Sequence, residues 1–121
     1  WSWGICLKEG LNELIGVIEI LELQGLENRG FWLARNHWGK GLMSEAVIPV
    51  TNFAFHQIGF HKLQFGNAVG NVRSRRIKEK SHARRIGTQP FEFVDPTFTQ
   101  IELWEITKDE WDRVARVGEF G

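Results

Sequence analysis

The feature that most constrains this fold is a glycine turn between an apolar segment and an amphipathic one. Phe31 to Ala34 has the composition of a strand, and Leu42 begins a segment with helical periodicity. Between them, Gly39 and Gly41 stand one residue apart. Such a turn leaves backbone N–H groups unpaired at the positive end of the helix dipole, and glycine allows a ligand to approach the backbone closely. The turn therefore predicts a local site for a phosphate or pyrophosphate.

Composition narrows the class of protein. The chain has 121 residues, 42% of them hydrophobic, and a formal net charge of zero. We therefore predict one domain, residues 1–121, with no nucleic-acid partner, since any anion site must be local. No apolar run approaches the roughly 20 residues that span a bilayer, so we expect no membrane partner. The single cysteine, Cys6, excludes an internal disulfide and a cysteine-based zinc cluster. We expect no metal, and a cytoplasmic location.

Hydrophobic periodicity and turn residues predict an order of strand, strand, strand, helix, strand, helix, strand, strand and a short terminal helix. This order favours a mixed α/β (α+β) sheet flanked by helices. The expected strands are 1–8, 14–23, 31–33, 61–65, 84–89 with 91–94, and 100–107, and the expected helices are 42–58, 72–81 and 108–117. Loops or turns are expected at 9–13, 24–29, 66–70 and 95–97. Pro49 should kink the first helix, and Gly59 should end it.

A second polar cluster opens the predicted helix at 72–81. Asn71 suits the N-cap position, because its amide oxygen can accept a free helix N–H, and Ser74 lies one turn later. A solvated basic helix and an RNA-binding helix are the alternatives, although a neutral chain with no RNA motif disfavours the second. If the two predicted strands are neighbours, both helix starts open onto one cleft. That cleft would hold a long ligand with a pyrophosphate at one end and an amide chain between the strands.

The order of elements and five motifs resemble the GNAT superfamily of N-acetyltransferases, and most closely the branch that acetylates ribosomal-protein N-termini. The resemblance runs from about Gly16 to Trp111, and its combined spacing is more specific than any single piece. The matching stretches are Gly30-Phe31-Trp32-Leu33, Trp38-Gly39-Lys40-Gly41-Leu42-Met43-Ser44-Glu45-Ala46, Asn71-Val72-Arg73-Ser74, Glu79-Lys80 and Ile101-Glu102-Leu103-Trp104.

The resemblance implies an enzyme with a largely antiparallel central sheet. This enzyme would move an acetyl group from acetyl-coenzyme A to a primary amine, by direct attack in a ternary complex. It also implies the residues that bind the donor. The backbone of the strand at 31–33 with Ala34 would bind pantetheine, and the glycine turn with Ser44 would hold the pyrophosphate. At the start of the second helix, Asn71 would lie near the pantetheine or acetyl group and Ser74 near the sulfur. Arg76 or Lys80 would reach the nucleotide phosphates. The full cofactor-binding set is Trp32, Leu33, Ala34, Trp38, Gly39, Lys40, Gly41, Leu42, Met43, Ser44, Asn71, Ser74 and Arg76.

For catalysis, the resemblance implies stabilisation of the oxyanion by a strand N–H near Leu33. Many relatives use a tyrosine as the acid, but this chain contains none. Ser74, acting directly or through water, is our candidate acid, with Asn71 facing the acetyl group. Glu27 is our candidate general base, and the alternative bases are Glu19, Glu22 and His37, of which the histidine is better explained as a surface residue.

The sequence departs from the family pattern at three places. Asn36 replaces the usual Arg or Gln before the glycines, and His82 stands where relatives carry a glycine that ends the second helix. The chain also begins at about the second family strand, so we expect the first strand and two helices, which shape the acceptor groove, to be absent. A fragment, or a homo-oligomer that covers the exposed edge, would follow from that. A non-catalytic module that binds coenzyme A or acyl-coenzyme A is the alternative function, and the amine acceptor stays open.

Overall fold

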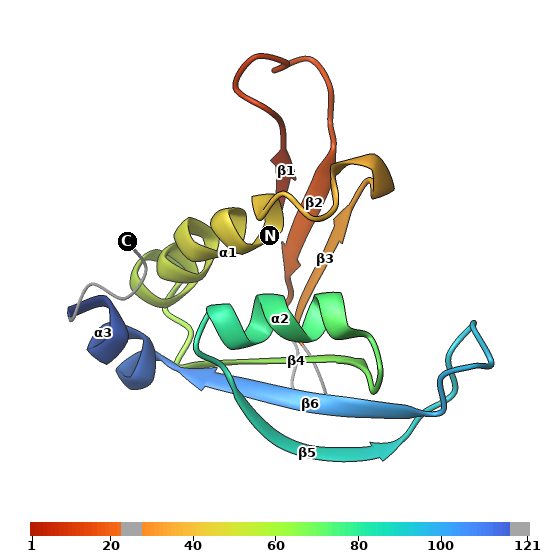
Figure 1. Ribbon diagram of the computed structural model, residues 1–121. Coiled ribbons are helices and arrows are strands. Elements are labelled where there is room, and N and C mark those ends of the chain that lie inside the picture. The colour runs from red at the N-terminus through yellow and green to blue at the C-terminus, as the bar shows by residue number, and fades with distance from the viewer. Residues whose placement is uncertain (23–27, 117–121) are drawn as a thin grey trace.

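The computed structural model describes residues 1–22 and 28–116, which form two antiparallel sheets with three helices packed against them (Figure 1). In the first sheet, β1 (Ser2–Ile5) pairs with β2 (Gly16–Ile20), which pairs with β3 (Arg29–Leu33). In the second, the order is β4 (Lys62–Ala68), β6 (Gln100–Thr107) and β5 (Arg84–Pro90). The predicted fold class is confirmed.

The helices lie where the periodicity placed them. α1 (Leu42–Phe53) continues into a π-helical turn, η2 (Ala54–Ile58), which ends at Gly59 with φ of 97°. α2 (Val72–Lys80) and α3 (Lys108–Arg116) follow β4 and β6, and a 3₁₀ turn, η1 (Arg35–His37), precedes the glycine turn. Pro49 lies inside α1 on its exposed side, and the helix runs through it.

One core joins the two sheets. Alternate residues of β2 and β4 point to the helices, where Ile18, Leu63 and Phe65 are fully buried, together with Val47 of α1 and Trp111 of α3. Period-2 burial on the strands and helical burial on α1 are what the apolar spacing predicted.

The two sheets touch at one end of their shared edge and diverge from there. The Asn28 backbone N–H donates to the Gln64 carbonyl at 2.8 Å, and the Asn28 Oδ1 accepts from the Gln64 N–H at 2.9 Å. From this contact β3 and β4 run apart, and α2 lies beside the opening (Figure 1).

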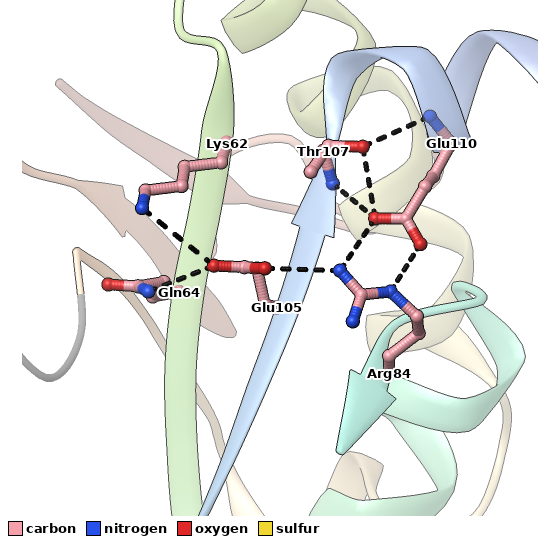
Figure 2. A network of polar contacts seen from close by, with 6 residues as sticks. All are labelled: Lys62, Gln64, Arg84, Glu105, Thr107 and Glu110. Atoms are coloured by element: carbon pink, nitrogen blue, oxygen red, sulfur yellow. Dashed lines mark hydrogen bonds and ion pairs between the residues drawn. The ribbon is translucent and has the colours of Figure 1, made fainter. Parts of the chain in front are cut away.

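A network of polar contacts fixes the outer face of the second sheet to α3. Arg84 of β5 donates to both Glu105 of β6 and Glu110 of α3, and Lys62 and Gln64 of β4 contact Glu105 (Figure 2). Glu110 and Thr107 also form a capping box: the Glu110 N–H donates to Thr107 Oγ1 at 3.2 Å, and the Thr107 N–H donates to Glu110 Oε1 at 3.0 Å. The network sets where α3 begins.

One loop prediction and one strand prediction are wrong, both in the second sheet. Residues 66–68 belong to β4, because Asn67 bonds the buried Glu102 of β6 and this cross-strand contact outweighs their turn-like composition. Residues 91–94 lie outside any strand. The ladder ends where Phe91 N–H donates to the Thr99 carbonyl. The turn at 95–97 is confirmed, with Asp95 Oδ1 accepting from the Thr97 N–H.

Candidate functional site

A cleft of about 410 Å³ lies between the glycine turn and α2. Leu33, at the end of β3, is one lining residue. The remaining lining comes from the glycine turn with the start of α1 and from one face of α2, as far as its last residue, Lys80. On one side these are His37, Trp38, Gly39, Gly41, Leu42, Met43 and Ser44, and on the other they are Val72, Arg73, Arg76, Ile77 and Lys80. The structure thus brings the two predicted helix starts to one cleft.

The glycine turn has the backbone conformation that the sequence predicted. Gly39 and Gly41 have φ of 77° and 74°, and no atom lies within 4 Å of the position that a Cβ would take at either residue. The glycines are therefore required by conformation rather than by crowding. Gly41 is the N-cap of α1 and offers no side-chain cap. The first N–H groups of α1 consequently remain available to an anion.

The start of α2 is built differently, because a side chain caps it. The Asn71 Oδ1 accepts from the Ser74 N–H at 3.2 Å, which confirms the predicted N-cap. The Asn71 amide oxygen is therefore engaged with its own helix, and the expectation that Asn71 faces the acetyl group stays a prediction.

The basic residues of α2 give the cleft its charge. Arg73, Arg76 and Lys80 all line it, at the three- and four-residue spacing that puts them on one helical face. The Arg73 guanidinium lies 3.4 Å from the centre of the Trp38 ring, and burial lowers the Arg73 pKa below its ordinary value. The Trp38 indole N–H donates to the Leu33 carbonyl at 2.8 Å. Although the formal net charge of the chain is zero, the three basic side chains Arg73, Arg76 and Lys80 lie together at the cleft.

The backbone of β3 presents alternate residues to the diverging edge. The Ala34 N–H donates to Ile15 O across β2, so the polar groups of Ala34 and, two residues earlier, Trp32 point toward β2. Those of Leu33 point the other way, toward the opening. Of the three residues expected to bind pantetheine, Leu33 alone lies on the cleft side. Trp32 carries an exposed side chain, and neither it nor Ala34 lines the cleft.

Ser74 lies beneath the cleft wall rather than on it. Its side chain is buried, and its Oγ accepts a hydrogen bond from Lys78 Nζ at 2.7 Å. Lys78 is itself buried beside the rings of Phe31 and Phe65. Neither Ser74 nor Asn71 belongs to the lining, and Lys40 is exposed beside it. Their predicted roles stay predictions.

The candidate bases are scattered. Glu27 lies outside the described residues, and Glu19 and Glu22 are exposed on and after β2. His37 lines the cleft, with a buried Nδ1 that has no hydrogen-bond partner among the described residues. Within residues 1–22 and 28–116, no group of three or more His, Cys, Asp and Glu side chains is placed to hold a metal ion. No helix in the same ranges has the length and apolar character to cross a membrane.

Sequence reasoning missed two features of the site. The contact of the Arg73 guanidinium with the Trp38 ring had no sequence signal, because the helical spacing of Arg73, Arg76 and Lys80 relates residues of α2 only to one another. Nothing in the sequence indicates that Lys78 is buried, because it lies in a run of charged residues that is typical of a solvent-exposed helix face.

Comparison with known proteins finds acetyltransferases, both as a family model and as curated relatives. The family model described as the acetyltransferase (GNAT) domain matches residues 1–84. A curated relative, "Probable N-acetyltransferase YjcK" of Bacillus subtilis, is 32% identical over 80 residues, which are 63% of this chain and 44% of the relative. The chain spans about half the length of the curated relatives it matches.

Solved structures share the fold. A mutant form of the spermidine/spermine N-acetyltransferase SpeG from Vibrio cholerae superposes with a TM-score of 0.79 over 93% of this chain and 69% of that chain, at 17% identity. The ribosomal-protein-S5-alanine acetyltransferase from Vibrio fischeri gives a TM-score of 0.72 over 82% and 57%, also at 17% identity.

Proposed function

Because the chain belongs to the acetyltransferase (GNAT) family, we propose that it transfers the acetyl group of acetyl-coenzyme A to a primary amine. The observation that carries this proposal is the cleft between the uncapped start of α1 and the basic face of α2. We treat residues 1–121 as one acetyltransferase unit. A cytoplasmic location and homo-oligomerisation stay predictions from the sequence.

The cleft suits the donor substrate in charge and shape. The Trp38 N–H already donates to the Arg35 carbonyl at 3.1 Å. The backbone N–H groups from Gly39 to Met43, with Ser44, would hold the pyrophosphate at the positive end of the α1 dipole. Arg76 and Lys80 would face the remaining nucleotide phosphate. The Leu33 carbonyl, which also accepts from the Trp38 indole N–H, would accept a pantetheine amide N–H with its second lone pair, as an added strand would be bound at the diverging edge of β3.

The reaction needs little from side chains once the two substrates are held together. A neutral amine attacks the thioester carbonyl, the new N–C bond forms, the C–S bond breaks, and coenzyme A leaves as a thiolate. The amine gives one proton to a base, and the thiolate takes one from an acid. We propose Leu33 N–H as the oxyanion donor, and Glu27 as the base.

The acid has to be supplied without a tyrosine, which the chain lacks. Thiolate is weakly basic, so a weak acid suffices. Ser74, with Asn71 at the helix start, remains our candidate. The buried Lys78 Nζ donates to Ser74 Oγ, and this hydrogen bond would make that hydroxyl a better proton donor.

The class of acceptor follows from what amines the similar proteins act on. SpeG is described as a spermidine/spermine N-acetyltransferase and the Vibrio fischeri protein as a ribosomal-protein-S5-alanine acetyltransferase. Both acceptors present a primary amine. We therefore propose a protein N-terminus or a small amine as the acceptor of this chain.

An acetyl-transfer assay tests the proposal. The full chain is incubated with acetyl-coenzyme A and a panel of peptides and polyamines, and the free thiol released is measured against controls without acceptor. We expect acceptor-dependent thiol release. Coenzyme A binding without transfer to any amine would instead support the alternative of a non-catalytic binding module. No binding at all would refute both.

A further inference from the structure

A carboxylate is buried beside the turn that leads into α2. Glu102 of β6 is 1% exposed. Its Oε1 accepts from Asn67 Nδ2 at 2.8 Å, and its Oε2 lies 3.6 Å from Nη1 of Arg85, whose side chain is half exposed. A buried carboxylate costs several kcal/mol unless it is hydrogen-bonded and paired. Both partners are present here, so the group is held in a defined geometry.

The same amide links this carboxylate to the turn. Asn67 Nδ2 donates both to Glu102 Oε1 and to the Ala68 carbonyl at 2.9 Å. Because both neighbours are acceptors, they fix the orientation of the Asn67 amide: in the flipped orientation, Oδ1 would face the Glu102 and Ala68 oxygens. The Ala68 carbonyl also accepts from the Asn71 N–H at 3.0 Å. A continuous chain of contacts therefore runs from Glu102 through Asn67 to the N-cap of α2.

The N-cap of α2 fixes the position of the first turn of α2, which lines one side of the cleft. Asn71 Oδ1 holds the Ser74 N–H, and the residues between them, Val72 and Arg73, line the cleft. The turn itself is tight, because Gly70 has φ of 104°. A shift of the Ala68 carbonyl would therefore be passed to Asn71 and to the first turn of α2.

We propose that Glu102, acting through Asn67, is a positioning residue for the coenzyme A site. It holds the first turn of α2, and with it Arg73, at the distance from the glycine turn at which both sides of the cleft contact one ligand. This inference rests on the proposed function. Glu102 does not line the cleft, so its action is indirect.

The chain supplies a matched control on the same strand. Glu105 of β6 is also a carboxylate paired with an arginine and with an amide, Arg84 and Gln64, but it lies on the outer face of the sheet (Figure 2). Replacing Glu105 removes comparable contacts without touching the turn at Ala68. A general loss of stability would affect both variants alike.

The test compares Asn67→Ala, Glu102→Gln and Glu105→Gln in the full chain, with coenzyme A affinity measured by calorimetry and amide exchange at Ser74 by mass spectrometry or NMR. Loss of a buried hydrogen bond predicts coenzyme A binding about tenfold weaker in Asn67→Ala. Glu102→Gln, whose Oε1 can still accept from Asn67, should weaken it only about threefold. Ser74 exchange should be faster in both, and unchanged in Glu105→Gln.

The outcomes separate the two ideas. If the unaltered chain fails to bind coenzyme A, the proposed function is wrong and this inference falls with it. If the unaltered chain binds coenzyme A, and Glu102→Gln and Asn67→Ala each bind it as tightly as the unaltered chain does, the positioning role alone is wrong. Weakening of the same size in Glu105→Gln would also overturn it. Should Asn67→Ala fail to fold, Glu102→Gln against Glu105→Gln decides the matter.

Discussion

A substitution in the glycine turn should change the stability of the fold and its affinity for coenzyme A by different amounts. Gly41 has φ of 74°, and no atom lies within 4 Å of the position its Cβ would occupy. Gly41→Ala therefore meets no clash, and its cost is the left-handed backbone, about 1–2 kcal/mol, reduced by the loss of freedom in the unfolded chain. The net loss of about 1 kcal/mol corresponds to a melting temperature about 4 °C lower.

The effect on coenzyme A should be larger. The added methyl group lies at the start of α1, where the phosphate oxygens must approach the backbone N–H groups. Losing one charge-assisted hydrogen bond costs about 1.5–3 kcal/mol, which is a tenfold to hundredfold loss of affinity. Calorimetric titration with coenzyme A measures it.

Gly59→Ala is the matched control. Gly59 also has positive φ, 97°, and also has open space at its Cβ position, but it follows the other end of the same helical segment, away from the cleft. We expect a similar drop in melting temperature and unchanged coenzyme A affinity. If Gly41→Ala binds as the unaltered chain does, or if Gly59→Ala weakens binding equally, the anion site is not at the glycine turn.

Three further predictions follow from the site and the outer network. Arg76→Ala and Lys80→Ala should each weaken coenzyme A binding and make it less sensitive to salt; an unchanged salt dependence would place the phosphates elsewhere. Ser74→Ala should lower turnover at saturating substrates, and unchanged turnover would remove the serine from the mechanism. The bidentate contact with Arg84 lowers the pKa of Glu110 to about 2, so its stabilisation is present above about pH 4.5 and is lost as the pH falls toward 2. Solvent reaches this pair, so the expected contribution is about 1 kcal/mol. Glu110→Gln should abolish that part of the acid dependence in melting curves, and identical curves would contradict the assignment.

Much of the fold could be predicted, because its signals are local. Period-2 alternation located β2 and β6, helical spacing located α1, and Gly59 and Asn71 marked a helix end and a helix start. His82, placed where relatives carry glycine, does adopt positive φ, 64°. Each of these depends on neighbours within a few residues, which a sequence displays directly.

The errors come from contacts distant in sequence. Residues 66–68 read as a loop because nothing nearby shows that Asn67 will meet Glu102, 35 positions later. The same holds for Ser74 at the site: spacing placed it at a helix start, but burial under Lys78 depends on how α2 packs against β3 and β4. A sequence pattern predicts which residues share a face, whereas tertiary packing decides what that face meets.

The central claim is that the cleft between the glycine turn and α2 holds acetyl-coenzyme A. A crystal structure of the full chain with coenzyme A tests it most directly. We expect the pyrophosphate on the backbone N–H groups between Gly39 and Met43, with Arg76 or Lys80 at the remaining phosphate. Coenzyme A bound elsewhere on the molecule, with this cleft empty, would contradict it.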